Sequence, residues 1–420
     1  MISNSAVSPA NPVVIIVGGG FAGLQAAKAL SGKPFSVVLL DRNNYHLFQP
    51  LLYQVATAGL GPEDISYPLR AILRGRPNVA FRMADVCGVD LAGRRVLTDG
   101  GAISYDYLLL AVGAETSFFG LDSVAANAVG LKNLTDALTL RNHILHMFEL
   151  ASQEQDPAIR RELLTFVVAG GGATGVESAG GLAELVHLVL SKDYPELDFA
   201  AVTLILLEGG DRLLLALPAS LAAFAARELR KKRVETRFHA RVAGFDGRTI
   251  TLADGTAIAA RTLVWAAGVK AASLIATLGV PTDRLGRAIV AETLQLPGHP
   301  EVFVVGDAAC REQDGQPLPM IAPVAVQQAA LAAANIAALA AGRRPAALDY
   351  SDPGTLATIG RSSAVATVGR WRFAGFTAWL LWLAIHLIRL VGFRNRFIVT
   401  VNWAWDYFFY ERAIRLILRI

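Results

Sequence analysis

Residues 13–24 have the sequence VVIIVGGGFAGL, and this stretch decides the fold of the chain. A run of β-branched residues is followed by Gly18, Gly20 and Gly23 in the spacing G-x-G-x-x-G, and then by an alanine-rich segment with a helical pattern. This order predicts a strand, a tight turn and a helix. Glycine permits the sharp turn, a close backbone approach and tight packing of helix on strand, which are the requirements of a dinucleotide phosphate site.

An acidic residue at the end of the next strand supports this interpretation. The apolar segment 37–41 ends in Asp41, 18 residues after Gly23. An acid in this place accepts hydrogen bonds from the ribose of an adenosine. The glycine motif alone is also compatible with an ordinary glycine-rich turn, but the glycines, the flanking elements and the acid together favour a bound dinucleotide.

Composition limits the class of protein. With 420 residues, the chain is long enough for two or three domains. Its only cysteines, Cys87 and Cys310, lie far apart and outside any C-x-x-C motif, so neither a disulfide framework nor a dithiol site is expected. The segment 361–420 holds nine arginines against two acids, a net charge of +7. Basic charge confined to one apolar end points to a membrane surface and not to nucleic acid.

The opening motif occurs a second time. Residues 164–177, LTFVVAGGGATGVE, repeat the pattern with Gly170, Gly172 and Gly175, and the later strand 202–208 ends in Glu208. Two such units imply two dinucleotides. A carboxylate accepts hydrogen bonds from a free 2′-hydroxyl and repels a 2′-phosphate, so Glu208 favours NADH over NADPH. Arg212, four residues further on, leaves contact with a phosphate open.

Three further segments carry polar groups with predictable roles. The apolar strand 301–305 leads into Gly306-Asp307, which places a carboxylate either at the ligand-binding edge of a sheet or at the N-cap of a helix. The segment 323–341 is strongly helical and opens with Pro323, so its first turn directs N–H groups and a positive partial charge outward. The segment 42–54 contains Pro50, and we expect a loop that covers a cofactor.

With these features placed, the chain resembles the type II NADH dehydrogenases, which are single-subunit flavoprotein NADH:quinone oxidoreductases. The segments that carry the resemblance are 45–53, 170–181, 322–328, 357–361 and 392–396. It implies an α/β fold with two Rossmann-like dinucleotide-binding domains and a C-terminal amphipathic helical region for membrane attachment. The expected domains are an FAD-binding domain in two parts, 12–120 and 287–345, an NADH-binding domain at 121–286, and the attachment region at 346–420.

The resemblance also implies roles for individual residues. The set expected to hold FAD is Gly18, Gly19, Gly20, Phe21, Ala22, Gly23, Asp41, Arg42, Val86, Ala111, Gly113, Gly306, Asp307 and Ala325. The set expected to hold NADH is Gly170, Gly172, Gly175, Glu208, Ala267 and Gly268. Glu177, Gln327 and Gln328 are the expected catalytic residues, and no metal is expected.

The chain departs from the family pattern beside these glutamines. Pro323 replaces a glutamine of the family's quinone motif, and Val326 stands where some members carry a histidine. Contacts of those members with the quinone headgroup therefore do not transfer to this chain.

The activity implied by the resemblance is transfer of a hydride from NADH to FAD and of two electrons to a membrane quinone, without proton pumping. A sulfide:quinone oxidoreductase is a rival enzyme, but its chemistry requires reactive cysteines beside the flavin, and this chain has only Cys87 and Cys310. A third alternative is a redox-sensing flavoprotein that binds NADH and acts through a protein partner.

The C-terminus predicts how the chain meets a bilayer. Five of the six tryptophans lie in the last 50 residues, among the arginines. The segment 373–393 is long enough to span a membrane, but His386 and Arg389 on one face favour a helix lying in the interface, followed by a second helix at 408–420 with Arg412, Arg415 and Arg419 on one side. We expect peripheral attachment to the cytoplasmic face of the cell membrane. A true span and an intramolecular or dimer contact are the alternatives.

Overall fold

The computed structural model describes residues 11–409 and 414–418. These residues form two compact units. Unit 1 comprises the residues up to His46 together with Tyr67–Glu115 and Val269–Asp352. Unit 2 comprises Leu47–Ser66, Thr116–Gly268 and the residues from Pro353 onward.

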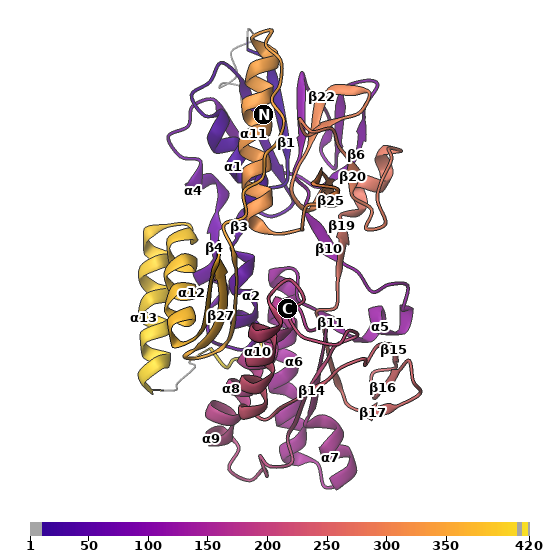
Figure 1. Ribbon diagram of the computed structural model, residues 1–420, viewed down its shortest axis with the longest axis vertical. Coiled ribbons are helices and arrows are strands. Elements are labelled where there is room, and N and C mark those ends of the chain that lie inside the picture. Colours follow the sequence, from indigo (N-terminus) through magenta and orange to yellow (C-terminus); the bar gives the residue numbers. More distant parts are fainter. Residues whose placement is uncertain (1–10, 410–413, 419–420) are drawn as a thin grey trace. The chain divides into compact units, whose positions relative to one another are not determined.

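Unit 1 is built on a six-stranded sheet with the order β21-β22-β9-β1-β2-β5. Its strands are β1 (Val13–Val17), β2 (Ser36–Asp41), β5 (Val79–Met83), β9 (Tyr107–Leu110), β21 (Gln295–Leu296) and β22 (His299–Val304). All neighbours run parallel except β21 and β22. In β1, the residues from Val14 to Val17 are buried, as expected for a parallel strand that is covered on both faces. The helices α1 (Phe21–Leu30) and α11 (Ala322–Ala340) pack against each other (Figure 1).

Unit 2 is built on a five-stranded, fully parallel sheet with the order β11-β18-β12-β13-β14. Its strands are β11 (Val129–Gly130), β12 (Thr165–Ala169), β13 (Thr203–Leu207), β14 (Val234–Arg237) and β18 (Thr262–Trp265). The second glycine motif joins β12 to α8 (Ala173–Glu184), which continues without a break into the π-helix η2 (Leu185–Leu190). The prediction of an α/β fold with two Rossmann-like parts is confirmed.

Shorter elements complete the two units. In unit 1 they are α4 (Leu69–Ile72), β6 (Val86–Asp90), β7 (Arg95–Thr98), β8 (Gly101–Ser104), η3 (Ser273–Leu278), β20 (Ala288–Ile289), η4 (Gly306–Ala308), β23 (Ala309–Cys310), β24 (Glu312–Gln313) and β25 (Gln316–Pro317). In unit 2 they are α3 (Pro62–Ile65), α5 (Asp122–Asn127), α6 (Leu134–Gln153), α7 (Pro157–Leu163), α9 (Ser191–Asp193), α10 (Ala219–Lys231), β15 (Val242–Phe245), β16 (Thr249–Leu252) and β17 (Ala257–Ala259). The strands β3 (Tyr45–Leu47), β4 (Ser66–Pro68), β10 (Ala114–Thr116) and β19 (Val269–Ala271) lie where the chain passes from one unit to the other.

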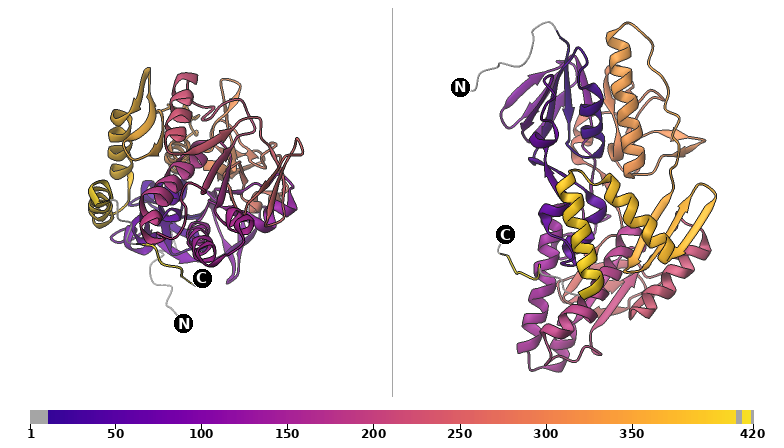
Figure 2. Two further views of the ribbon diagram at one scale, coloured as in Figure 1. Left: turned by 90° about the horizontal axis from the view of Figure 1, so that it is seen from below. Right: turned by 90° about the vertical axis from the view of Figure 1, so that its left-hand side faces the viewer.

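The C-terminal region is a small sheet followed by two helices. The strands β26 (Thr355–Gly360), β27 (Ser363–Val368) and β28 (Trp371–Gly375) are antiparallel. The helices α12 (Phe376–Arg389) and α13 (Phe393–Phe409) then run side by side and are drawn in yellow in the right-hand view of Figure 2. Arg396 on α13 donates hydrogen bonds to the carbonyl oxygens of Ile388 and Leu390, both at 2.8 Å, and so caps the end of α12.

The structure corrects three expectations about this region and the early loop. The candidate span 373–393 is not one helix, because α12 has only 14 residues, about 21 Å at 1.5 Å per residue, short of the hydrocarbon core of about 30 Å. His386 does not face outward but stacks on Trp382, with ring centroids 4.1 Å apart. Pro50 does not keep 42–54 a loop: it sits in the first turn of η1 (Gln49–Leu51), which leads into α2 (Leu52–Ala56).

The predicted second amphipathic helix is also changed. Its first residues belong to α13, residues 414–418 have no helical structure, and Arg412 and Arg419 lie outside the described residues. Arg415 instead pairs with Asp193 at 2.9 Å. Among the residues that the structure describes, one helix, α11, is long and apolar enough to cross a membrane, and it is the partly buried partner of α1.

Candidate functional site

The first glycine motif forms an open turn in front of α1. Gly18 has a φ of +103°, and a Cβ atom built on it would collide with the carbonyl oxygen of Ala111, which follows β9. A Cβ atom on Gly23 would collide with the carbonyl oxygen of Gly18. By contrast, a Cβ atom on Gly20 would meet no atom within 4 Å. The structure therefore leaves empty space at the N-terminus of α1, where a pyrophosphate fits.

Side chains around this turn are fixed by its backbone. Asp41 accepts hydrogen bonds from the N–H groups of Gly19 at 2.6 Å and Asn43 at 2.7 Å. Burial raises the pKa of Asp41, while these two bonds and Arg42 oppose the shift. The buried imidazole of His46 bonds the carbonyl oxygen of Gly19 at 3.0 Å. Arg42 itself is exposed and lies 3.6 Å from Asp85, so this ion pair contributes little stability.

Several other predicted FAD residues of unit 1 converge on the same turn. A Cβ atom built on Gly306 would lie 3.4 Å from Cβ of Ala325 and 3.6 Å from Cβ of Ala22, so Gly306 sits between α11 and α1. Gln328 is 1% exposed, and its Oε1 accepts from the Gly306 N–H at 2.6 Å. Its Nε2 has no partner among the described residues. This buried amide donor is therefore available to an acceptor of a bound ligand or water.

The remaining predicted residues of unit 1 are placed as follows. Gly113 follows β9 with a φ of +71°, Val86 opens β6, and Asp307 lies in η4 beside Gly306. Phe21 opens α1 and packs edge-on against His46, with ring centroids 5.3 Å apart. Gln327 is tied to the backbone of Ser351 by two hydrogen bonds, at 2.8 and 3.1 Å.

The second glycine motif has the same geometry. Gly170 has a φ of +109°, and Cβ atoms built on Gly170 and Gly175 would collide with the carbonyl oxygens of Ala266 and Gly170. A Cβ atom on Gly172 would meet nothing within 4 Å. Glu208, directly after β13, accepts from the N–H groups of Gly171 and Gly210, both at 2.6 Å. Ala267 and Gly268 directly follow β18. This turn also fits a dinucleotide.

Glu177 lies one turn further along α8 and is buried. Its carboxylate accepts from the N–H of Thr358 on β26 at 3.3 Å. Burial raises the pKa of Glu177 to about 8, and the Thr358 N–H and the Trp382 indole oppose the shift. The Trp382 indole N–H does not form a hydrogen bond with the Glu177 carboxylate and has no partner among the residues described. Glu177 therefore holds a proton at neutral pH.

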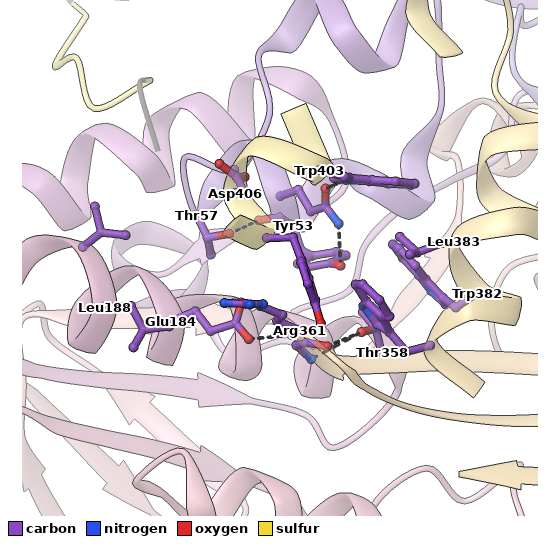
Figure 3. A pocket seen from close by; sticks show the side chains of 17 residues that line it. Tyr53, Thr57, Glu184, Leu188, Thr358, Arg361, Trp382, Leu383, Trp403 and Asp406 are labelled. Carbon is purple, nitrogen blue, oxygen red and sulfur yellow. Dashed lines mark hydrogen bonds between the residues drawn. The ribbon is translucent and has the colours of Figure 1, made fainter. Parts of the chain in front are cut away.

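A pocket in unit 2 lies in front of Thr358 (Figure 3). Its walls come from α2, from α8 with η2, from β26 and the turn after it, and from α12 and α13. The labelled lining residues are Tyr53, Thr57, Glu184, Leu188, Thr358, Arg361, Trp382, Leu383, Trp403 and Asp406. Its aromatic and aliphatic side chains suit a flat ligand with an apolar body, and its polar side chains can bind the polar groups of that ligand.

Polar contacts fix the walls of this pocket. Trp403 Nε1 donates to Gln54 Oε1 at 2.8 Å, and Gln54 Nε2 donates to the Tyr53 hydroxyl at 2.8 Å. Glu184 accepts from the Arg361 N–H at 2.6 Å and pairs with Lys232 at 2.7 Å. The Arg361 guanidinium lies over the Tyr407 ring, 4.1 Å from its centroid.

Asparagines hold α13 against the segment that carries α3. Asn395 is 2% exposed and donates to the carbonyl oxygens of Glu63, Asp64 and Ser66 at 3.0–3.1 Å. Asn402 donates to the Asp64 carboxylate at 3.1 Å. These contacts and the Gln54–Trp403 pair were not predicted, because each joins residues more than 300 positions apart. The one sequence signal was an asparagine within the apolar, arginine-rich segment 392–396.

Family models match most of the chain. The model described as pyridine nucleotide-disulphide oxidoreductase matches residues 12–329, and the model described as NDH2 C-terminal domain matches residues 353–411. Among solved structures, the NDH2 of Plasmodium falciparum in complex with NADH shares the fold with a TM-score of 0.88 and 18% identity, over 97% of this chain and all of that chain. The sulfide:quinone oxidoreductase of Aquifex aeolicus, at 19% identity, gives a TM-score of 0.69 over 95% of this chain and 96% of that chain.

Curated relatives are closer in sequence. The type II NADH:quinone oxidoreductase Ndh of Mycobacterium tuberculosis is 41% identical over 95% of this chain and 89% of the relative. The type II NADH:quinone oxidoreductase NdhA of the same organism is 40% identical, with coverage of 95% and 87%. Together with the two family models and the two glycine turns, this similarity shows that the chain belongs to the type II NADH:quinone oxidoreductases, FAD-containing enzymes that oxidise NADH and reduce quinone.

Proposed function

We propose that the two glycine turns divide the cofactor and the reductant of this NADH:quinone oxidoreductase. The turn of unit 1, with Asp41 and Gly306-Asp307, would hold FAD, and the turn of unit 2, with Glu208 and Ala267-Gly268, would hold NADH. The support is the same in both: an open position at the N-terminus of a helix and an acid at the end of the next strand. We assign the FAD-binding part to 12–120 and 287–345 and the NADH-binding part to 121–286.

FAD, when bound, supplies the electron-transfer chemistry of the reaction: it accepts the hydride of NADH and releases two electrons to quinone. The chain supplies the positions of the partners. Glu208 would orient the adenosine ribose, since its carboxylate is itself held by two backbone N–H groups. Gln328 would donate a hydrogen bond from its unpartnered Nε2 to an acceptor of the cofactor. Gln327 would act only after exchanging its bonds to Ser351.

The pocket of unit 2 is our candidate for the quinone site. The observation that carries this assignment is the buried Glu177 behind the Thr358 wall, protonated at neutral pH because burial raises its pKa to about 8. Reduction of a quinone to the quinol takes up two protons, and a protonated carboxyl beside the pocket is a proton store for that step. Glu177 is thus the proposed proton donor.

Glu177→Gln tests this role. The variant keeps the size and the hydrogen bond to Thr358 but cannot release a proton. We expect quinone-dependent NADH oxidation to fall by about a hundredfold, the contribution typical of a general acid, while flavin reduction by NADH in stopped flow stays unchanged. Unchanged quinone turnover would remove Glu177 from the proton path, and NADH oxidation that no quinone accelerates would contradict the assignment of the pocket as a whole.

We further propose that α12 and α13 attach the chain to the surface of a bilayer. An apolar row with a spacing of three or four residues lies exposed along α13: Phe393, Phe397, Val401, Trp405 and Phe408. Phe393 is 85% exposed, and Ile388 on α12 is 68% exposed. Trp371 and Arg372 are exposed on β28, the strand that packs against α12. Apolar rows edged by tryptophan and arginine are typical of helices that lie in the membrane interface.

Flotation with lipid vesicles tests the attachment. Phe397→Ser with Trp405→Ser should abolish flotation with vesicles that contain anionic lipid, whereas Leu150→Ser, an exposed apolar residue on α6, should float like the parent. If the double variant floats normally, or the parent forms a stable homodimer that covers this face without lipid, attachment through α13 is wrong. Because NADH does not cross a bilayer, we assign the cytoplasmic face, and inverted membrane vesicles should oxidise added NADH where right-side-out vesicles do not.

A further inference from the structure

Phe119 adopts a backbone conformation that its side chain disfavours. Phe119 and Gly120 have φ values of +52° and +78°, and the N–H of Leu121 donates to the carbonyl oxygen of Phe118 at 2.9 Å. A turn with two left-handed central residues favours asparagine followed by glycine. A bulky aromatic residue in the first place is an outlier. Burial does not explain it, because Phe119 is 61% exposed.

The ring is nevertheless held in a defined place. A Cβ atom built on Gly268 would lie 2.5 Å from Cζ of Phe119, so the ring covers the bare face of this glycine. The N–H of Ser117 donates to the carbonyl oxygen of Gly268 at 3.1 Å, and Trp265 Nε1 donates to the carbonyl oxygen of Ser117 at 2.7 Å. The Phe119 ring also meets Trp265 edge-on, with centroids 6.4 Å apart. The segment 117–119 and the end of β18 therefore form one rigid piece.

This piece lies beside the phosphate turn of unit 2. A Cβ atom on Gly170 would approach Ala267 Cα to 2.7 Å, so the peptide before Gly268 backs the turn directly. In the sheet order β11-β18-β12-β13-β14, Glu208 at the end of β13 lies on one side of β12, and β18 lies on the other. The acid marks the adenosine half of a dinucleotide. The nicotinamide half therefore leaves the turn on the side of β18, where Phe119 stands.

We propose that Phe119 is a binding residue for the nicotinamide riboside half of NADH, and that the strained turn exists to present its ring there. This inference rests on the proposed NADH site of unit 2. An exposed aromatic face suits the planar nicotinamide, and the negative charge density of that face attracts the positive charge of the oxidised form. Strain of this kind persists where function requires it.

The neighbouring Phe118 provides an internal contrast. Its ring stacks on Trp265 with centroids 5.9 Å apart and planes 28° apart, and it packs against the buried cluster of unit 2. The two adjacent phenylalanines thus have different roles. Phe118 anchors the loop in the core, and Phe119 presents an exposed ring, held in place against Gly268, at the carboxyl edge of the sheet.

Binding measurements on the FAD-loaded protein test the inference. The ligands are NAD⁺ and ADP-ribose, which lacks the nicotinamide, and the variants are Phe119→Ala, Phe119→Asn and Phe119→Tyr. We expect Phe119→Ala and Phe119→Asn to weaken NAD⁺ binding by about tenfold and to leave ADP-ribose binding unchanged, while Phe119→Tyr retains both. Phe119→Asn should also raise the melting temperature, because asparagine tolerates the left-handed conformation.

The outcomes separate this inference from the assignment of the site. Unchanged NAD⁺ binding in Phe119→Ala overturns the inference, and so does an equal loss of ADP-ribose binding, which would show a general disturbance of the site. Leu150→Ala, which changes an exposed apolar residue on α6, is the control and should bind both ligands like the parent. A parent protein that binds NAD⁺ but shows no weakening in Gly172→Val would instead contradict the proposed NADH site.

Discussion

The two glycine turns have the same arrangement of glycines and acid. They differ in the side chain that follows one turn into the helix. In both, the first glycine has a left-handed conformation and the middle glycine of the motif faces open space. An acid accepts a hydrogen bond of 2.6 Å from the N–H of the residue between these two glycines. At equivalent positions, α1 carries the half-buried Gln25 and α8 carries the buried Glu177. In the function we propose, each glycine turn would bind a dinucleotide, and the side chain at this next position would determine whether the helix also handles a proton.

The packing of the two helices explains the difference in burial. α1 packs against the alanine-rich α11, whereas α8 packs against β26. A Cβ atom on Gly180 would collide with the carbonyl oxygen of Ile359, so this glycine lets the strand come close. The equivalent residue of α1 is Lys28. Glycine in a helix interior costs about 1 kcal/mol relative to alanine, and here it brings the Thr358 N–H onto Glu177.

The largest expected effect comes from filling the open glycine of each turn. Gly172→Val should weaken NADH binding by more than about a hundredfold and leave FAD bound, because the new side chain extends into the phosphate space and its Cβ atom meets no protein atom within 4 Å. Gly20→Val should give folded protein without flavin absorbance. Circular dichroism checks the fold, flavin absorbance checks FAD, and calorimetry checks NADH. If each variant lost both ligands, the division between the turns would be wrong.

A smaller effect is expected from the acids. Glu208→Gln should reduce the preference for NADH over NADPH by about tenfold, because it removes the charge that repels a 2′-phosphate. Asp41→Asn, the matched change in the other turn, should leave this preference unaltered. The measurement is kcat/KM for each nucleotide with a short-chain quinone. Equal discrimination in Glu208→Gln and the parent would show that another group, such as Arg212, selects the nucleotide.

The last expected effect concerns stability and not activity, and it depends on pH. The pKa of Glu177 rises from 4.5 to about 8 on folding, so between these pH values the unfolded chain ionises while the folded chain keeps its proton. This contribution to stability is complete below pH 4.5 and falls by roughly 1 kcal/mol per pH unit up to about 8. Glu177→Gln lacks this loss. Urea unfolding at several pH values should show that the free energy of unfolding of the variant increases relative to that of the parent as pH rises. If the two free energies change in parallel with pH, the burial argument is wrong.

The sequence predicted the two turns, their acids and the strands that flank them, because these depend on local spacing alone. It also predicted an apolar, basic C-terminal region. It did not predict the helix after Pro50, because proline is compatible with a first helical turn as well as with a loop. The short sheet β26–β28 was missed, because the apolar run 373–393 begins inside its last strand.

The parts of the site that remained hidden depend on distant contacts. Thr358 binds Glu177 across 181 positions, and Trp403 binds Gln54 across 349 positions. No local pattern specifies such pairs. The strained turn at Phe119 had a local trace, an aromatic residue before a glycine, but its conformation follows from the bonds of Ser117 to β18.

Because Trp403 on α13 is hydrogen-bonded to Gln54, extraction of the protein from a membrane would affect the measured activity. α13 carries the exposed apolar row on one side, while Trp403, Asp406 and Tyr407 form part of the pocket wall on the other. A detergent that lifts this helix breaks the 2.8 Å bond to Gln54 and opens the wall in the same movement. With the proposed quinone pocket and the proposed attachment through α13, quinone affinities measured in different detergents would belong to differently shaped pockets, and the lipid-bound enzyme would be the reference state for inhibitor work.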